Sequence, residues 1–144
     1  MNLAFHISEY ELARVLLVDD DPASRLTLKT VLEAGGYKVY TAGSAAEAVG
    51  ELDEGEYELV LSDLQLESPE AGLKVLAQAR MMDYKPATAL ITAYQDSRPE
   101  PTARQQRSML ISPEDVPGLL GKIADMIAER ATRRLRRELR LAGV

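Results

Sequence analysis

Short apolar runs alternate with stretches of helical periodicity along most of the chain. The apolar runs predict strands at 14–18, 37–41, 57–62 and 88–92, and a short one at 109–111. The first and third read RVLLV and YELVLS, which is typical of strands buried on both faces. Helices are predicted between them at about 22–34, 44–53 and 71–82, and a long last helix runs from 116 to about 140.

Local signals mark where two of these helices begin. Asp21 is a helix N-cap residue with Pro22 at the first helical position. Ser44 and Glu47 have the spacing of a capping box. The segment 94–107 carries two prolines and few apolar residues, so no regular helix of normal length is predicted there.

The alternation of strands and helices with short connections predicts an α/β fold with a parallel sheet covered on both faces. For five strands the common doubly wound order is 2-1-3-4-5, the flavodoxin-like arrangement, here followed by a long C-terminal helix. In such sheets ligands bind beyond the carboxyl ends of the strands, beside the point where the strand order reverses. That point lies between the first and third strands.

Composition narrows the chemistry. A chain of 144 residues has room for one compact domain. There is no cysteine and only one histidine, His6, which excludes thiol nucleophiles, disulfides and histidine- or cysteine-rich metal sites. The first residues resemble no signal peptide and no apolar run approaches transmembrane length, so we expect a cytoplasmic protein without membrane contact.

The charge is divided unevenly. The net charge is -6, yet residues 129–144 contain six arginines and only two glutamates. The chain before them is strongly acidic and repels nucleic acid, so nucleic-acid binding is not expected.

Acidic residues gather at the predicted switch point. Asp19, Asp20 and Asp21 follow the first strand, and Asp63 follows the third. Crowded carboxylates repel one another unless a cation joins them, and oxygen ligands suit Mg²⁺. One such carboxylate can also act as a nucleophile and form an acyl phosphate.

The segments LLVDDDPASRLTLKTVLEAGGYKV, YELVLSDLQL and ALITAY together resemble the receiver domain of two-component response regulators. The resemblance implies that Asp63 accepts a phosphoryl group from a histidine kinase. It further implies that Asp20 binds Mg²⁺ directly and Asp19 through water, and that the backbone carbonyl of Gln65 is a further metal ligand. Thr92 falls at the hydroxyl residue that hydrogen-bonds the phosphoryl oxygen in this family.

Four departures from the family pattern stand out. Ser112 occupies the place of a nearly invariant lysine that pairs with the phosphoryl group, and Met109 stands where an aromatic residue is usual. The segment between the fourth and fifth strands is rich in proline, arginine and glutamine. The loop after Asp63 is one residue longer than is usual in the family, so that Gly72 and not Ala71 takes the family's glycine position.

The resemblance implies a receiver domain at 14–128, with an N-terminal extension at 1–13 and a basic helical extension at 129–144. We expect it to act in a phosphorelay with a histidine kinase or phosphotransfer protein and a downstream protein, without turnover as an enzyme. The alternative is a degenerate receiver that binds partners without phosphorylation. A haloacid dehalogenase type of phosphohydrolase fits poorly, because Ala23 replaces the threonine that follows its acid pair.

The basic C-terminal helix has two sides. Four small or apolar residues fall near one side and four arginines near the other: Ala128, Ala131, Leu135 and Leu139 against Arg130, Arg133, Arg137 and Arg140. We favour solvated arginines on an extended last helix. The alternative is a homodimer or partner helix that uses Leu135 and Leu139. Membrane contact is disfavoured because aromatic anchors are absent.

Overall fold

The structure is a computed structural model that describes residues 12–64, 66–91, 110–111 and 116–143. Its strands are β1 (Arg14–Val18), β2 (Lys38–Ala42), β3 (Leu59–Asp63), β4 (Ala87–Ile91) and β5 (Leu110–Ile111). Its helices are α1 (Pro22–Ala34), α2 (Ala45–Glu54), α3 (Ala71–Arg80) and α5 (Val116–Leu141). These bounds differ from the predicted ones by at most two residues, and those of β1 and α1 are the same as predicted.

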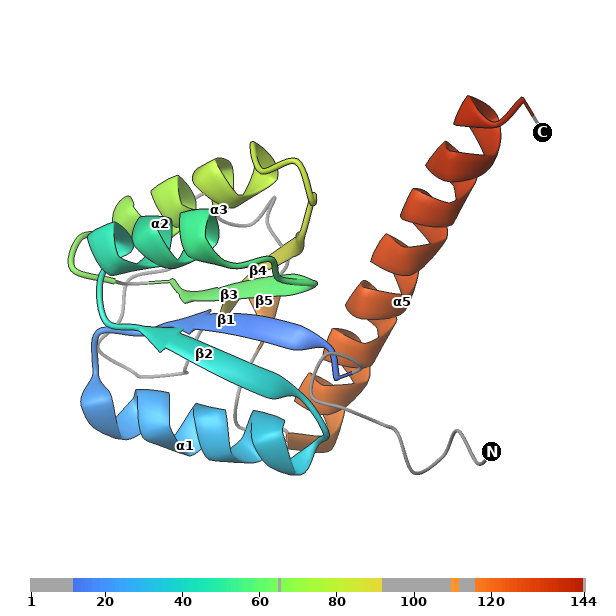
Figure 1. Ribbon diagram of the computed structural model, residues 1–144. Coiled ribbons are helices and arrows are strands. Elements are labelled where there is room, and N and C mark those ends of the chain that lie inside the picture. Colours follow the sequence, from blue (N-terminus) through green and yellow to red (C-terminus); the bar gives the residue numbers. More distant parts are fainter. Residues whose placement is uncertain (1–11, 65, 92–109, 112–115, 144) are drawn as a thin grey trace.

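The strands form one parallel sheet in the order β2-β1-β3-β4-β5. Helices α2 and α3 cover one face, and α1 and the first part of α5 cover the other (Figure 1). The α/β fold and the order 2-1-3-4 are therefore as predicted. The described part of β5 is only two residues long and pairs with Leu90 and Ile91.

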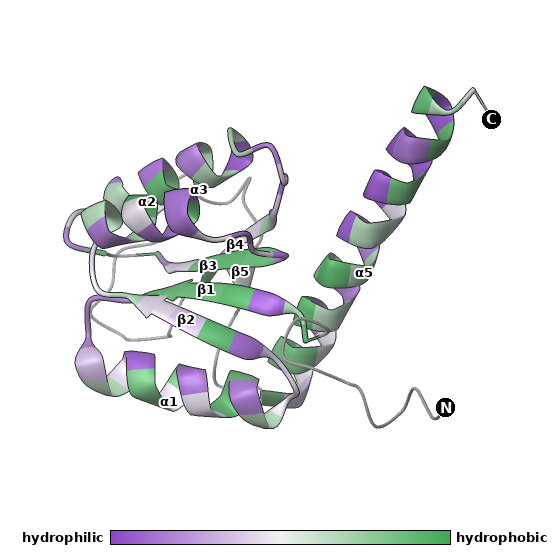
Figure 2. Cartoon of the chain, viewed as in Figure 1, coloured by the Kyte–Doolittle hydropathy of each residue, from purple (hydrophilic) through white to green (hydrophobic). Residues whose placement is uncertain are grey.

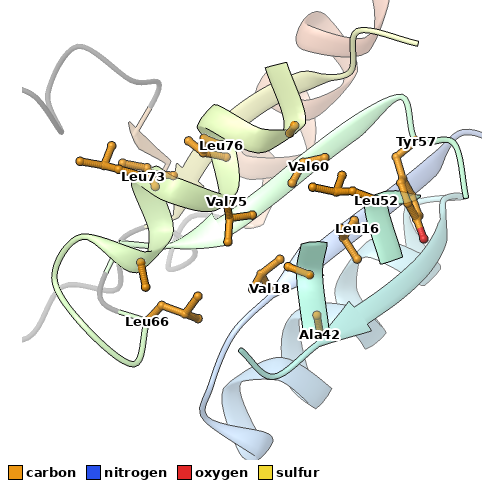
Figure 3. Packing of buried hydrophobic residues seen from close by; sticks show 14 of the residues in the cluster. Leu16, Val18, Ala42, Leu52, Tyr57, Val60, Leu66, Leu73, Val75 and Leu76 are labelled. Atoms are coloured by element: carbon orange, nitrogen blue, oxygen red, sulfur yellow. The ribbon is translucent and has the colours of Figure 1, made fainter. Parts of the chain in front are cut away.

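Alternation along the central strands gives the sheet a core on each face. In β1, Leu16 and Val18 point to the α2 and α3 side, whereas Val15 and Leu17 point to the α1 and α5 side. All four are fully buried. Figure 3 shows the first core, where Leu52 of α2 and Leu76 of α3 lie over strand residues. This explains why the strands read as continuous apolar runs.

The helix starts follow the sequence signals. The Asp21 carboxylate accepts a hydrogen bond from the Ser24 N–H (3.0 Å), as expected of the α1 N-cap. The Ser44 hydroxyl accepts from the Glu47 N–H (3.1 Å), and the Glu47 carboxylate accepts from the Gly43 N–H (2.8 Å). Both predicted caps are confirmed, and they fix where the chain turns after β1 and β2.

The C-terminal helix corrects one expectation. Arg130, expected among solvated arginines, is buried with 7% of its surface exposed. Its guanidinium donates to the backbone carbonyls of Tyr84 (2.6 Å) and Lys85 (2.9 Å). The periodicity gave the wrong environment because the face that packs on the sheet passes through Leu119, Ile123 and Met126 and then reaches Arg130. Burial is the main cause that lowers the pKa of Arg130.

The remaining arginines of α5 are exposed, as expected, and Leu135 and Leu139 are exposed at 56% and 43%. Beyond the sheet, α5 projects away from the body (Figure 1). Within the described parts of the chain, no helix is both long and apolar enough to cross a membrane.

Candidate phosphoacceptor and metal site

Three carboxylates meet at the carboxyl edge of the sheet. Asp19 and Asp20 directly follow β1, and Asp63 is the last residue of the neighbouring strand β3. One carboxylate oxygen from each lies within 4.8 Å of the others. Asp19 is buried with 2% exposed, Asp63 is partly buried and Asp20 is exposed. The cluster is thus open on one side and anchored on the other.

Backbone contacts hold the turn after β1. The Asp19 N–H donates to the Ala42 carbonyl at the end of β2 (3.0 Å), and the Asp19 carboxylate accepts from the Asp21 N–H (2.9 Å). This leaves the second carboxylate oxygen of Asp19 for other ligands. The turn is therefore fixed from two directions before any cation binds.

Arg25 also holds this turn, a role that the sequence analysis missed. Its guanidinium donates to the Asp19 carbonyl (2.8 Å). It also lies against Gly43, where a Cβ atom would approach the Arg25 Nη1 to 3.1 Å. Arg25 therefore holds the turn after β1 and packs against the residue that follows β2. Its position on the first turn of α1, the helix that Asp21 caps, is the only signal that could have found it.

The position of Asp63 depends on a close approach by α3. A Cβ atom at Gly72 would lie 2.6 Å from the Asp63 carbonyl oxygen, closer than real Cβ atoms come. The N–H of Leu64 donates to the Ile91 carbonyl (2.8 Å), so the chain stays paired with β4 just after Asp63. Only glycine lets α3 begin this close to β3. Gly72 thus stands where the family resemblance put the glycine.

The loop after Asp63 is fastened to α2. The Glu67 carboxylate accepts from the Ala45 N–H in the first turn of α2 (2.8 Å), an interaction that the helix dipole favours. Leu66 is buried in the core beneath the loop (Figure 3). Glu67 was not singled out from sequence, because a lone exposed glutamate in a loop carries no signal of a cap on a distant helix.

The donor set fits a hard divalent cation. Carboxylate oxygens are the ligands that Mg²⁺ takes in proteins, usually one or two together with waters and phosphate oxygens. Among the described residues, Asp19, Asp20 and Asp63 form the group able to hold a metal. Gln65, Thr92, Ser112 and Met109 lie outside the described residues, so their predicted roles stay predictions.

We expect Mg²⁺ to raise the thermal unfolding temperature, because it relieves the repulsion among the three carboxylates. The variant Asp20→Ala should lose most of that rise, as measured by thermal unfolding with and without millimolar Mg²⁺. The matched control is Asp21→Ala, which removes the α1 cap and about 0.5–2 kcal/mol of stability. It should keep the Mg²⁺-dependent rise. A wild type that does not respond to Mg²⁺ would argue against the metal site.

Comparison with known proteins agrees with this geometry. The family model of the response regulator receiver domain matches residues 15–108. The chain belongs to the response regulator receiver domain family, which acts in two-component signalling.

Two curated relatives illustrate the similarity. The transcriptional regulatory protein GlrR of Escherichia coli is 33% identical over 122 residues, which covers 83% of this chain and 27% of that protein. The alginate biosynthesis transcriptional regulatory protein AlgB of Pseudomonas putida is 41% identical over 81 residues, or 56% of this chain and 18% of that protein. The chain spans about a quarter of the length of the first and less of the second.

Solved structures are similar over most of the fold. A CheY-like receiver domain protein from Methanospirillum hungatei is 25% identical with a TM-score of 0.71, covering 85% of this chain and 98% of that one. The response regulator TrrA from Thermotoga maritima, solved in complex with Mg²⁺-BeF, is 27% identical with a TM-score of 0.65. That match covers 80% of this chain and 99% of TrrA.

Proposed function

We propose that this receiver domain accepts a phosphoryl group on Asp63 with the help of Mg²⁺. The observation that carries the proposal is the meeting of three carboxylates from two adjacent strand ends, with Asp63 partly accessible and its backbone fixed by Gly72. A relative of known structure that holds Mg²⁺ and beryllofluoride supports the same chemistry.

In the proposed reaction, a carboxylate oxygen of Asp63 attacks the phosphorus of a phosphohistidine on the donor protein. A phosphorus–oxygen bond forms as the phosphorus–nitrogen bond breaks, and the bond electrons leave with the imidazole nitrogen, which then takes up a proton. When bound, Mg²⁺ neutralises charge on the phosphoryl oxygens. Asp19 and Asp20 would hold the cation, and the hydrogen bond from the Asp21 N–H would keep Asp19 in place.

The partners follow from this chemistry. The donor would be a histidine kinase or a phosphotransfer protein, and the acyl phosphate would alter contacts with a downstream protein. The domain would catalyse only the phosphotransfer to its own Asp63, and it would then be a signalling domain and not an enzyme that turns over a separate substrate. The match covers only a minor part of the length of the longer relatives, so their downstream response is no part of this proposal.

Beryllofluoride binding tests the site without a donor protein. We expect wild type to bind this phosphoryl mimic in the presence of Mg²⁺, as measured by calorimetry. Ser112→Lys should bind it about 10- to 100-fold more tightly, because a hydrogen bond to a charged group contributes about 1.5–3 kcal/mol.

The control for added charge is Thr132→Lys, an exposed position on α5 with no part in the site. It should leave the affinity for the mimic unchanged. Binding by neither wild type nor Ser112→Lys would favour a receiver that binds partners without phosphorylation.

A further inference from the structure

Two grooves of opposite charge lie next to each other near the loop between α3 and β4. The basic groove, of about 560 Å³, lies between that loop and α5. Its cations outnumber its two acids, Asp83 and Glu138, and six of these cations are Arg80, Lys85, Arg133, Arg134, Arg137 and Arg140. The acidic groove, of about 750 Å³, is lined by Asp53, Glu54, Glu56, Glu58 and Asp83. The acidic groove includes Glu58, which directly precedes β3, whereas Asp63 is the last residue of that strand, so the groove and the acid cluster lie at opposite ends of β3.

The basic groove arises from the way α5 continues beyond the body. Its sheet-facing side is apolar through Met126 and then reaches Arg130. With 3.6 residues per turn, the same side continues through Arg134 and Arg137. Leu135 and Leu139 fall on the opposite side. Figure 2 shows hydrophilic residues recurring along this outer part of the helix. The side of α5 that faces the body therefore changes from apolar to cationic.

A narrow boundary separates the grooves. Asp83 and Tyr84 line both of them. Burial, together with the nearby Glu56 and Asp53 carboxylates, raises the pKa of Tyr84 to about 12. On the other side, Arg134 adds to burial in lowering the pKa of Arg130. Carboxylates therefore act on Tyr84, and an arginine acts on Arg130, on the two sides of the boundary.

The charges on the two sides do not neutralise each other by close pairing. In the described part of the chain, Arg134 and Arg137 make no ion pair within 4.0 Å, and neither do Glu54 and Glu56. The one arginine in the acidic groove, Arg14, lies over the ring of Tyr40 at 4.5 Å. Both grooves therefore carry charged side chains that could pair with opposite charges on a partner.

We propose that a second copy of this chain docks here, with the basic groove of each copy against the acidic groove of the other. A two-fold axis that runs along the Asp83–Tyr84 boundary produces this pairing. Rotation about that axis places the basic groove of one copy opposite the acidic groove of the other copy. A small anion would bind in the basic groove alone and would leave the carboxylates of the acidic groove without a cationic partner. A dimer through Leu135 and Leu139 would use the other side of α5.

This pairing must overcome repulsion between two copies that each carry a net charge of -6. The attraction is local and ionic, so salt should weaken it. Between about 0.1 M and about 1 M salt the Debye length falls from about 10 Å to about 3 Å. The docking surface does not include Asp63, so this inference does not rest on the proposed phosphorylation.

Analytical ultracentrifugation of the full chain tests the proposal. Wild type should dimerise at about 0.1 M salt and dissociate at about 1 M salt. The pair Arg134→Glu/Arg137→Glu should be monomeric at low salt, and so should Glu54→Lys/Glu56→Lys. Mixing the two variants should restore a mixed dimer, because each then supplies the charge that the other now needs.

The control pair Lys122→Glu/Arg136→Glu lowers the net charge by the same amount as Arg134→Glu/Arg137→Glu does. Its two positions are exposed on α5 and line neither groove. It should dimerise within a few-fold of wild type. A monomeric wild type at low salt would overturn the proposal, as would a mixture of the two groove variants that stays monomeric. A salt-resistant dimer lost in Leu135→Ala/Leu139→Ala would overturn it in favour of the leucine side of α5.

Discussion

Replacing Gly72 with alanine should both destabilise the fold and abolish phosphorylation of Asp63. The new Cβ atom would lie 2.6 Å from the Asp63 carbonyl oxygen, a backbone atom that cannot move without shifting β3 or the start of α3. Overpacking of this kind costs about 1–3 kcal/mol. Urea unfolding measures the loss of stability, and mass analysis after incubation with acetyl phosphate measures the loss of phosphorylation.

Gly121→Ala is the matched control for this substitution. Gly121 also lies in a helix, but among the described residues a Cβ atom there would meet nothing within 4 Å beyond its own chain neighbours and helix backbone. Alanine there should raise stability by up to about 1 kcal/mol through its higher helix propensity and leave phosphorylation unchanged. If Gly72→Ala were as stable and as active as wild type, the close approach of α3 to Asp63 would be wrong.

Replacing Arg130 with methionine should lower the free energy of unfolding by about 1.5–3 kcal/mol. Methionine keeps much of the buried stem but cannot donate to the carbonyls of Tyr84 and Lys85. The bond to Tyr84 is buried, so water cannot readily replace the lost donor, whereas the Lys85 bond is only partly buried. The loss of the hydrogen bond to the buried Tyr84 carbonyl therefore accounts for most of the decrease in the free energy of unfolding.

Arg136→Met makes the same chemical change at an exposed position of α5 and should alter stability by no more than about 0.5 kcal/mol. Equal effects of the two substitutions in urea unfolding would contradict the anchoring role of Arg130. A larger effect at Arg130 would show that the bonds to the α3–β4 loop, and not the general loss of an arginine, hold α5 on the body.

The sequence predicted the fold well because its strongest patterns are local. Strands buried on both faces read as unbroken apolar runs, and the Asp21 and Ser44 caps mark helix starts by residue type alone. The convergence of Asp19, Asp20 and Asp63 followed from strand order, since carboxyl ends of adjacent parallel strands share an edge.

What the sequence could not predict depends on contacts between distant segments. The Glu67 cap on α2 joins residues 22 apart in the chain, and Arg130 reaches carbonyls 45 and 46 residues away. Helical periodicity placed Arg130 with the other arginines of α5, because it describes the helix alone and not which side the sheet covers.

Incubation with acetyl phosphate and Mg²⁺, followed by intact-mass analysis, tests the central claim most directly. We expect wild type to gain one phosphoryl group in the presence of Mg²⁺ and none when the cation is chelated. Asp63→Asn should gain none, whereas Asp53→Asn, at an exposed aspartate in α2, should match wild type. A wild type that gains no phosphoryl group, or an Asp63→Asn variant that still gains one, would contradict phosphorylation at Asp63.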